Sequence, residues 1–139
     1  MKVVAISGYF DPLHVGHIRY IQEAKKLGDK LVIILNNDEQ AKLKKGFSFM
    51  PFEERKEILM NIKDVTDIFE SIDIDSSVCK SLEELKPNIF ANGGDRNKGN
   101  IPEVKICEKN NIELIDNIGG GKIQSSNWLL SNFRKHLRI

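Results

Sequence analysis

The residues best suited to chemistry lie near the amino terminus, where two histidines stand three positions apart. His14 and His17 belong to a segment that begins at Gly8 and also contains Gly16. Side chains three apart at the start of a helix project from the same side, and imidazoles can donate hydrogen bonds to phosphate oxygens. Because Gly16 lacks a Cβ, a triphosphate could approach its backbone closely. The pattern predicts stabilisation of charge during transfer at phosphorus, with the attacking oxygen supplied by a substrate rather than by the protein.

The elements that must position these histidines are predicted from hydrophobic patterning. Short, continuous apolar runs at residues 3–6 and 31–35 are typical of strands buried on both faces of a parallel sheet. Periodic apolar positions from residue 15 to 27, followed by Gly28, predict a helix. Alternation of strands and helices then continues, which predicts one three-layer α/β domain over residues 1–139 with right-handed crossovers. Further strands are expected at 68–69, 89–91 and 112–115, and further helices at 52–62, 78–85, 102–110 and 126–137.

The predicted position of the histidines suits phosphate binding. The segment follows the first strand and opens the first helix. In an open parallel sheet, ligands bind beyond the carboxyl ends of the strands, near the point where strand order reverses. A helix amino terminus there offers backbone N–H groups and a positive dipole end to phosphates. We therefore expect the two imidazoles to face a polyphosphate.

Residues 8–17 resemble the signature of the cytidylyltransferase-like nucleotidyltransferases, G-x-F-D-x-x-H-x-G-H, at all six fixed positions. The resemblance spans nearly the whole chain and implies a Rossmann-like α/β/α fold with a five-stranded parallel sheet in the order 3-2-1-4-5. It implies transfer of CMP or AMP from CTP or ATP to a polyol, alcohol or sugar phosphate, with release of pyrophosphate. His14 and His17 would be catalytic; the alternative is a pair of surface histidines beside a structural turn. The nucleotide contacts implied in this segment are Gly8, Tyr9, Phe10, Asp11 and Gly16.

A basic stretch and the helix after it resemble two further parts of the family. Lys44 and Lys45 precede Gly46 and are similar to the family's lysine loop, and Arg55 matches the arginine of the next helix. The resemblance implies that Lys44, or failing that Lys45, contacts the phosphates of both substrates, and that Arg55 also binds substrate. The alternatives are a solvated charge cluster on a loop for the lysines, and a helix-surface or inter-subunit ion pair for Arg55.

The loop after the fourth expected strand resembles the part of the family that holds the base and ribose. Glycines at the end of a strand allow close backbone approach, and Asp95 and Arg96 follow as possible anchors. The alternative is a tight turn capped by Asp95. The implied nucleotide contacts in this loop are Asn92, Gly93, Asp95 and Arg96.

The stretch before the last helix resembles the family's G-I-S-T-T phosphate-binding motif. Ser125 and Ser126 stand at its hydroxyl positions, and Lys122 could add a charge. The stretch departs from the motif, because Gln124 replaces the usual serine and Gly119 stands where some cytidylyltransferases have arginine. A helix cap by Ser125 alone is the alternative. Within the family, glycerol-phosphate cytidylyltransferases and heptose-phosphate adenylyltransferases both remain open, as do adenylyltransferases of the flavin or phosphopantetheine type and a non-catalytic nucleotide sensor.

Composition limits the partners and the location. A net charge of +1 disfavours nucleic acid as a partner. No apolar stretch is long enough for a bilayer, and the amino terminus lacks a signal-peptide pattern, so we expect a cytoplasmic protein without a membrane partner. Cys79 and Cys107 lie far apart, so no protein metal site is expected and both thiols should be reduced. Mg²⁺ is expected to accompany the triphosphate. Residues 72–78 and Trp128 are expected near the acceptor; for Trp128, a core or subunit contact is favoured over stacking on substrate. The resemblance implies a homodimer.

Overall fold

The computed structural model describes residues 1–93, 102–119 and 125–137 of this chain. Its centre is a five-stranded sheet in the order β3-β2-β1-β4-β5, with every neighbouring pair parallel. The predicted fold class and strand order are therefore confirmed. The strands are β1 (Val3–Gly8), β2 (Lys30–Leu35), β3 (Asp67–Glu70), β4 (Ile89–Gly93) and β5 (Glu113–Ile118).

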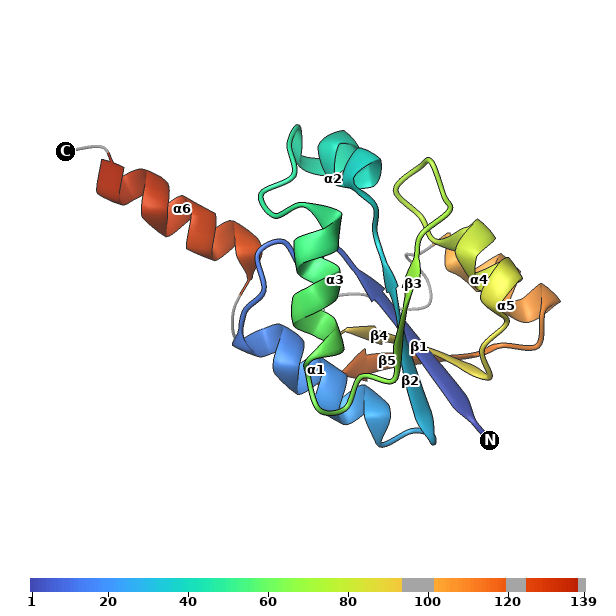
Figure 1. The fold of residues 1–139 in the computed structure, drawn as a ribbon. Coiled ribbons are helices and arrows are strands. Elements are labelled where there is room, and N and C mark those ends of the chain that lie inside the picture. Colours follow the sequence, from blue (N-terminus) through green and yellow to red (C-terminus); the bar gives the residue numbers. More distant parts are fainter. Residues whose placement is uncertain (94–101, 120–124, 138–139) are drawn as a thin grey trace.

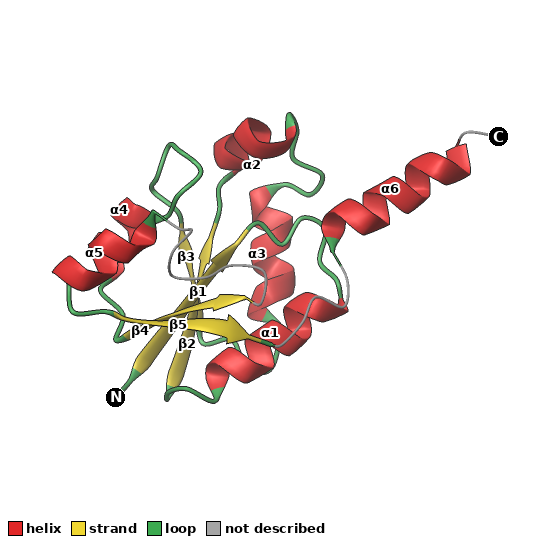
Figure 2. Ribbon diagram, turned by 180° about the vertical axis from the view of Figure 1, so that it is seen from behind, coloured by secondary structure: helices red, strands yellow, loops and turns green. Residues whose placement is uncertain are grey.

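Helices cover both faces of the sheet (Figure 1). The helices α1 and α3 pack on one face, and α4 and α5 pack on the other. The last helix, α6, points away from the body of the molecule, which is clearest in Figure 2. The helices are α1 (Val15–Lys25), α2 (Asp38–Lys45), α3 (Phe52–Met60), α4 (Cys79–Leu85), α5 (Glu103–Lys109) and α6 (Ser126–Leu137).

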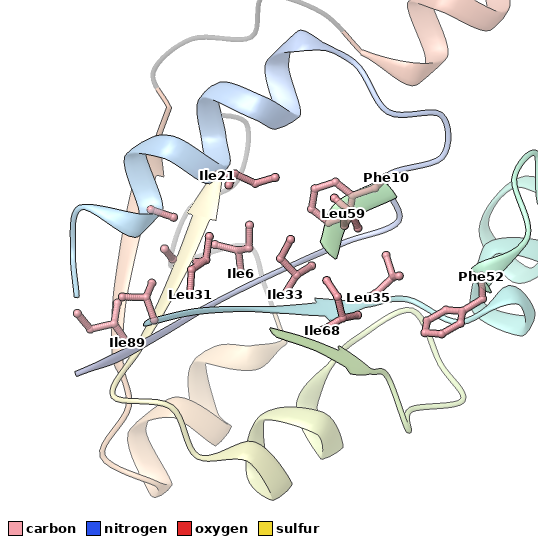
Figure 3. Packing of buried hydrophobic residues seen from close by; sticks show 13 residues of the cluster. Ile6, Phe10, Ile21, Leu31, Ile33, Leu35, Phe52, Leu59, Ile68 and Ile89 are labelled. Carbon is pink, nitrogen blue, oxygen red and sulfur yellow. The ribbon is translucent and has the colours of Figure 1, made fainter. Parts of the chain in front are cut away.

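Two hydrophobic clusters, one on each face, hold the layers together. Adjacent residues of a strand point to opposite faces, so Ile33 of β2 belongs to the cluster under α1 and α3 while Ile34 belongs to the cluster under α4 and α5. Figure 3 shows the first cluster, in which Ile21 of α1 and Leu59 of α3 meet the sheet. This double burial explains why the central strands are continuously apolar in sequence.

The helix α2 corrects one prediction. Lys44 and Lys45 were expected on a loop, but they form the last turn of a helix. Asn37 caps that helix by accepting a hydrogen bond from the backbone of Gln40, while the Gln40 side chain accepts one from the backbone of Asn37. This reciprocal capping box favours a helix although its residues are almost all polar. Gly46, with φ of 84°, ends the helix in the left-handed conformation.

Strand order fixes where a ligand can bind. The order reverses between β1 and β4, so β1 ends at the switch point of the sheet. The histidine segment begins at Gly8, the last residue of β1, and leads into α1. No helix in the described part of the chain is long and apolar enough to cross a membrane.

Candidate active site

His14 and His17 form a stacked pair at the amino terminus of α1. His14 is the N-cap residue, and its Nδ1 accepts a hydrogen bond from the Gly16 backbone N–H at 3.1 Å. The Nδ1 of His17 accepts from the His14 backbone N–H at 3.2 Å. The ring centroids are 3.8 Å apart with 25° between the ring planes. The prediction that the two imidazoles point the same way is confirmed, and the cause is that each ring acts as a helix cap.

These backbone hydrogen bonds also decide which nitrogen carries the proton. A nitrogen that accepts from an N–H cannot itself be protonated, so each neutral ring carries its proton on Nε2. Burial, followed by the neighbouring His14, lowers the pKa of His17 to about 3. His17 is therefore neutral at physiological pH in the unliganded protein, and it presents an Nε2–H donor. The pair supplies hydrogen-bond donors rather than a covalent nucleophile.

Phe10 and Gly8 support His17 from the interior. The Phe10 ring is buried, and its centroid lies 4.6 Å from that of His17. Phe10 adopts a φ of 51°, which a bulky residue seldom takes. A Cβ on Gly8 would lie 2.8 Å from Cε2 of Phe10, so glycine leaves room for the ring. Both residues were predicted as nucleotide contacts; in the structure Phe10 packs against the His17 ring, and Gly8 leaves room for Phe10.

Asp11 connects the histidine segment to the loop between α2 and α3. Its buried carboxylate accepts hydrogen bonds from the backbone N–H groups of Phe49 at 2.8 Å and Met50 at 2.5 Å. Lys45 completes the arrangement, with Nζ 2.9 Å from the carboxylate and 2.7 Å from the Asp11 carbonyl oxygen. The predicted nucleotide contact is thus an internal anchor in this structure.

The two lysines at the end of α2 differ in their surroundings. The Lys45 side chain is 14% exposed and is paired with Asp11. The Nζ of Lys44 lies 4.6 Å from the centre of the Tyr9 ring, directly beside the histidine segment. The two lysines therefore have different neighbours: Lys45 is held by Asp11, and Lys44 lies over the Tyr9 ring.

Arg55 lies in the interior, which corrects the expectation that it faces substrate, a helix surface or a second subunit. Its side chain is fully buried, and it donates four hydrogen bonds. Nε reaches the Met50 carbonyl at 2.9 Å, and Nη1 reaches the carbonyls of Tyr9 and Asn36, each at 2.8 Å. Nη2 meets the Asp38 carboxylate at 2.7 Å. Arg55 therefore positions the histidine segment through its backbone.

A second set of contacts, missed from sequence, ties α2 to the loop after β3. The buried Gln40 donates from Nε2 to the carbonyls of Asp75 at 2.7 Å and Ser77 at 2.9 Å. Asp73 in the same loop accepts from the backbone N–H groups of Lys80 at 2.8 Å and Ser81 at 2.9 Å. The loop expected near the acceptor is thereby fixed at the carboxyl edge of the sheet.

The predicted base-binding and phosphate-binding loops are only partly described. Asn92 is buried, and its Nδ2 lies 3.5 Å from a carboxylate oxygen of Asp116. Gly93 ends β4, where the pairing with β5 is irregular. Asp95, Arg96 and Lys122 lie outside the described residues.

The amino terminus of α6 lies beside that of α1. Ser125 caps α6, since its Oγ accepts the Trp128 backbone N–H at 3.0 Å. Ser126 donates from Oγ to the Pro12 carbonyl at 2.8 Å. The helix cap named above as the alternative for Ser125 is therefore present. Two helix amino termini meet at the switch point, an arrangement suited to a polyphosphate.

The two cysteines lie on α4 and α5. Cys79 and Cys107 are free thiols, and burial raises the pKa of both, that of Cys107 to about 11. Within the described ranges, no group of three or more histidine, cysteine, aspartate or glutamate side chains could hold a metal ion. The donors at the site are imidazoles, a lysine and helix amino termini, all suited to an anionic ligand.

Comparison with known proteins identifies the family. The model of the cytidylyltransferase-like family matches residues 5–114. The chain is 39% identical over 94 residues to an FAD synthase of Pyrococcus abyssi, covering 67% of this chain and 63% of the relative. It is 37% identical over 123 residues to the bifunctional protein HldE of Citrifermentans bemidjiense, covering 86% of this chain and 25% of HldE. The chain thus spans about three fifths of the FAD synthase.

Solved structures agree with this relationship. A lipopolysaccharide core biosynthesis protein from Thermoplasma volcanium is 28% identical, with a TM-score of 0.69 over 84% of this chain and 95% of that one. A protein of unknown function from Archaeoglobus fulgidus shares the fold, with a TM-score of 0.55 over 84% of this chain and 88% of that one at 24% identity. The signature at residues 8–17, the strand order and the family match agree, and this chain belongs to the cytidylyltransferase-like family of nucleotidyltransferases.

Proposed function

We propose that this protein transfers AMP from ATP to a small phosphomonoester and releases pyrophosphate. The observation that carries the proposal is the stacked His14 and His17 pair at the switch point of the sheet. ATP is favoured over CTP for two reasons. Relatives named FAD synthase make a product that contains AMP, and Gly119 replaces the arginine of some cytidylyltransferases.

The proposed reaction needs positioning and charge stabilisation. A phosphate oxygen of the acceptor attacks the α-phosphorus of ATP, a new P–O bond forms, and the bond to the β-phosphate breaks as pyrophosphate leaves. Negative charge grows on the α-phosphate oxygens and on the leaving group. The Nε2–H donors of His14 and His17 and the N–H groups at the starts of α1 and α6 would stabilise that charge. Lys44 would bring the acceptor phosphate and the triphosphate together.

Mg²⁺ is part of the proposal as an ion carried by the triphosphate. The buried carboxylate within the histidine segment, that of Asp11, is occupied by Lys45 and two backbone N–H groups. The donors around it are cationic or N–H groups, which fit a metal–triphosphate complex better than a bare ion. When bound, Mg²⁺ would neutralise charge on the triphosphate.

The acceptor is proposed to be a polyol, alcohol or sugar phosphate, with flavin mononucleotide as the second candidate. The HldE relatives match over most of this chain, whereas the FAD synthase matches favour the flavin. A phosphopantetheine acceptor and a non-catalytic sensor remain further outcomes of the test. We also propose a homodimer working in the cytoplasm, where nucleoside triphosphates are available.

The test is pyrophosphate release from purified full-length protein with each triphosphate against a panel of phosphomonoesters. The panel contains glycerol 3-phosphate, heptose and hexose phosphates, flavin mononucleotide and phosphopantetheine. We expect release with ATP and one sugar or alcohol phosphate. Release with flavin mononucleotide alone would support the second candidate, and release with CTP alone would contradict the choice of ATP. Binding of triphosphate without release for any acceptor would favour the sensor.

The roles of the two histidines are tested by single substitutions. His14→Ala and His17→Ala should each lower turnover by ~10²-fold or more, the scale of losing one charge-stabilising donor. Circular dichroism should show that both variants fold. A near-normal turnover number for either variant would contradict the role assigned to that histidine.

A further inference from the structure

Two side-chain amides at the start of α2 hold the loop that follows β3. This loop, residues 71–77, is called the β3–α4 loop below. The Nδ2 of Asn37 and the Nε2 of Gln40 each donate to two of its backbone carbonyls, at distances of 2.7–3.2 Å. The four carbonyls belong to every second residue of the loop, namely Ser71, Asp73, Asp75 and Ser77. Both ribbon views show the loop beside α2 (Figures 1 and 2).

The capping of α2 does not require these amide nitrogens. The capping box uses only the side-chain oxygens, because Oδ1 of Asn37 accepts from the Gln40 backbone and Oε1 of Gln40 accepts from the Asn37 backbone. Serine or aspartate would cap a helix as well as asparagine does. The nitrogens of Asn37 and Gln40 therefore have a separate task, which is to fix the β3–α4 loop.

The fixed carbonyls decide which side chains of the loop face outward. The side chains of Ser71, Asp73 and Ser77 are buried. Between them, Ile72 is 53% exposed and Ile74 is 83% exposed. Ser76 is also exposed. The loop thus presents a defined set of outward side chains at the carboxyl edge of the sheet, where ligands bind in this type of fold.

The same side of α2 carries the lysine that is proposed to bind the acceptor phosphate. Gln40 and Lys44 are four residues apart, so they lie on one side of the helix and about 6 Å apart along its axis. The Nζ of Lys44 lies 4.6 Å from the centre of the Tyr9 ring in the histidine segment. An acceptor whose phosphate meets Lys44 therefore binds between the histidine segment and the β3–α4 loop.

We infer that Asn37 and Gln40 are positioning residues for the acceptor. By holding four carbonyls they set the β3–α4 loop at the distance from Lys44 that the acceptor requires. They do not belong to the nucleotide side of the site, which is built from the starts of α1 and α6. The inference deepens the proposed function, and it rests on that function for the nature of the acceptor as a phosphomonoester.

The main test is the substitution Asn37→Ser. Serine keeps an oxygen that can cap α2, adds no charge, and lacks the nitrogen that holds the carbonyls of Ser71 and Asp73. The members of the acceptor panel named above that bind wild type are titrated calorimetrically into protein saturated with Mg²⁺ and α,β-methylene-ATP. Asn37→Ser should bind them about tenfold more weakly, because a displaced loop no longer fits the acceptor. The affinity for α,β-methylene-ATP, and turnover at saturating acceptor, should stay at the wild-type values.

A second variant and a matched control accompany this test. Gln40→Met is neutral and similar in length, and it removes the donors to Asp75 and Ser77 together with one half of the capping box. It should weaken acceptor binding in the same direction. Asn61→Ser makes the same exchange as the main variant at an exposed position, where Nδ2 donates to the Glu57 carbonyl at 2.8 Å. This control should bind the acceptor and the nucleotide like wild type.

Hydrogen exchange measures the loop without any ligand. The Asp73 carboxylate accepts from the backbone N–H groups of Lys80 at 2.8 Å and Ser81 at 2.9 Å, while its carbonyl is held by Asn37. In Asn37→Ser the amide protons of Lys80 and Ser81 should exchange faster than in wild type, and those of β1 should not. Nuclear magnetic resonance of the ¹⁵N-labelled proteins follows each amide separately.

The outcomes separate this inference from the proposed function. Faster exchange with unchanged acceptor affinity, unchanged exchange, or an equal loss of nucleotide affinity would each show that the inference is wrong. If wild type releases pyrophosphate while Asn37→Ser binds the acceptor normally, only the inference fails. If wild type binds an acceptor that Asn37→Ser binds weakly, but never releases pyrophosphate, only the proposed function fails. If wild type binds no member of the panel, both are contradicted.

Discussion

At the scale of single residues, the site depends on side chains whose surroundings fix their chemical state. His17 is neutral because burial and His14 depress its pKa, and its proton lies on Nε2 because Nδ1 accepts a backbone hydrogen bond. Asp11 and Arg55 are ionisable residues used as internal anchors. The chemistry assigned to the histidines therefore depends on the residues packed behind them.

The depressed pKa of His17 predicts a pH dependence of stability. Between pH 6.5 and about 3 the unfolded chain binds a proton at this position and the native protein does not, so native stability falls as pH decreases through this range. From pH 7 to pH 5, His17 should account for about 1–2 kcal/mol of lost unfolding free energy. Urea unfolding of wild type and His17→Gln at pH 7 and pH 5 measures this loss. If the unfolding free energy falls equally in the two proteins, the depressed pKa of His17 is contradicted.

Substitution of the buried Arg55 should lower the stability of the fold. Arg55→Met should lower the free energy of unfolding by about 3 kcal/mol, because buried carbonyl groups and Asp38 lose their partner. Arg55→Lys should recover little, because an ammonium cannot replace a guanidinium that makes four directed bonds. Chemical denaturation of both variants provides the measurement. If Arg55→Met loses less than about 0.5 kcal/mol of unfolding free energy, Arg55 does not hold these segments together as proposed.

At the scale of elements, apolar periodicity predicted the strands and helices that enter the hydrophobic core. It failed for the polar helix α2 and for the buried polar side chain of Arg55. The central strands were predictable because both of their faces are buried, and α1 and α3 because one face of each enters a core. The helix α2 was missed because its residues are almost all polar and only the Asn37 and Gln40 capping box indicates it. The burial of Arg55 was also missed, since its partners are mostly carbonyl groups from distant segments and charged residues normally lie at the surface.

Substitutions at Gly46 measure how much the left-handed end of α2 contributes to stability. Its φ of 84° lies in the left-handed region, and no atom lies within 4 Å of the position a Cβ would take. Gly46→Ala should therefore cost about 1 kcal/mol from backbone conformation alone, and Gly46→Asn should cost less. Thermal unfolding of wild type and of the two variants measures these stability losses. Equal stability of Gly46→Ala and wild type would show that the helix ends differently.

At the scale of the whole molecule, the fold brings distant segments to one end of the sheet. The histidine segment, the lysines of α2 and the start of α6 meet there, although they span most of the chain. Strand order and the position of the signature made this convergence predictable. The acceptor was not predictable, because its surroundings depend on loop backbone and on side chains without a distinctive pattern.

The central claim is that His14 and His17 hold the reacting polyphosphate through their Nε2–H groups. Nuclear magnetic resonance of ¹⁵N-labelled imidazoles, during titration with Mg²⁺ and α,β-methylene-ATP, tests it most directly. The account predicts that both Nε2 resonances shift on binding, and that the pKa of His17 rises from about 3 as negative charge arrives beside the ring. Saturation of the protein with nucleotide while both imidazole resonances stay unchanged would contradict it.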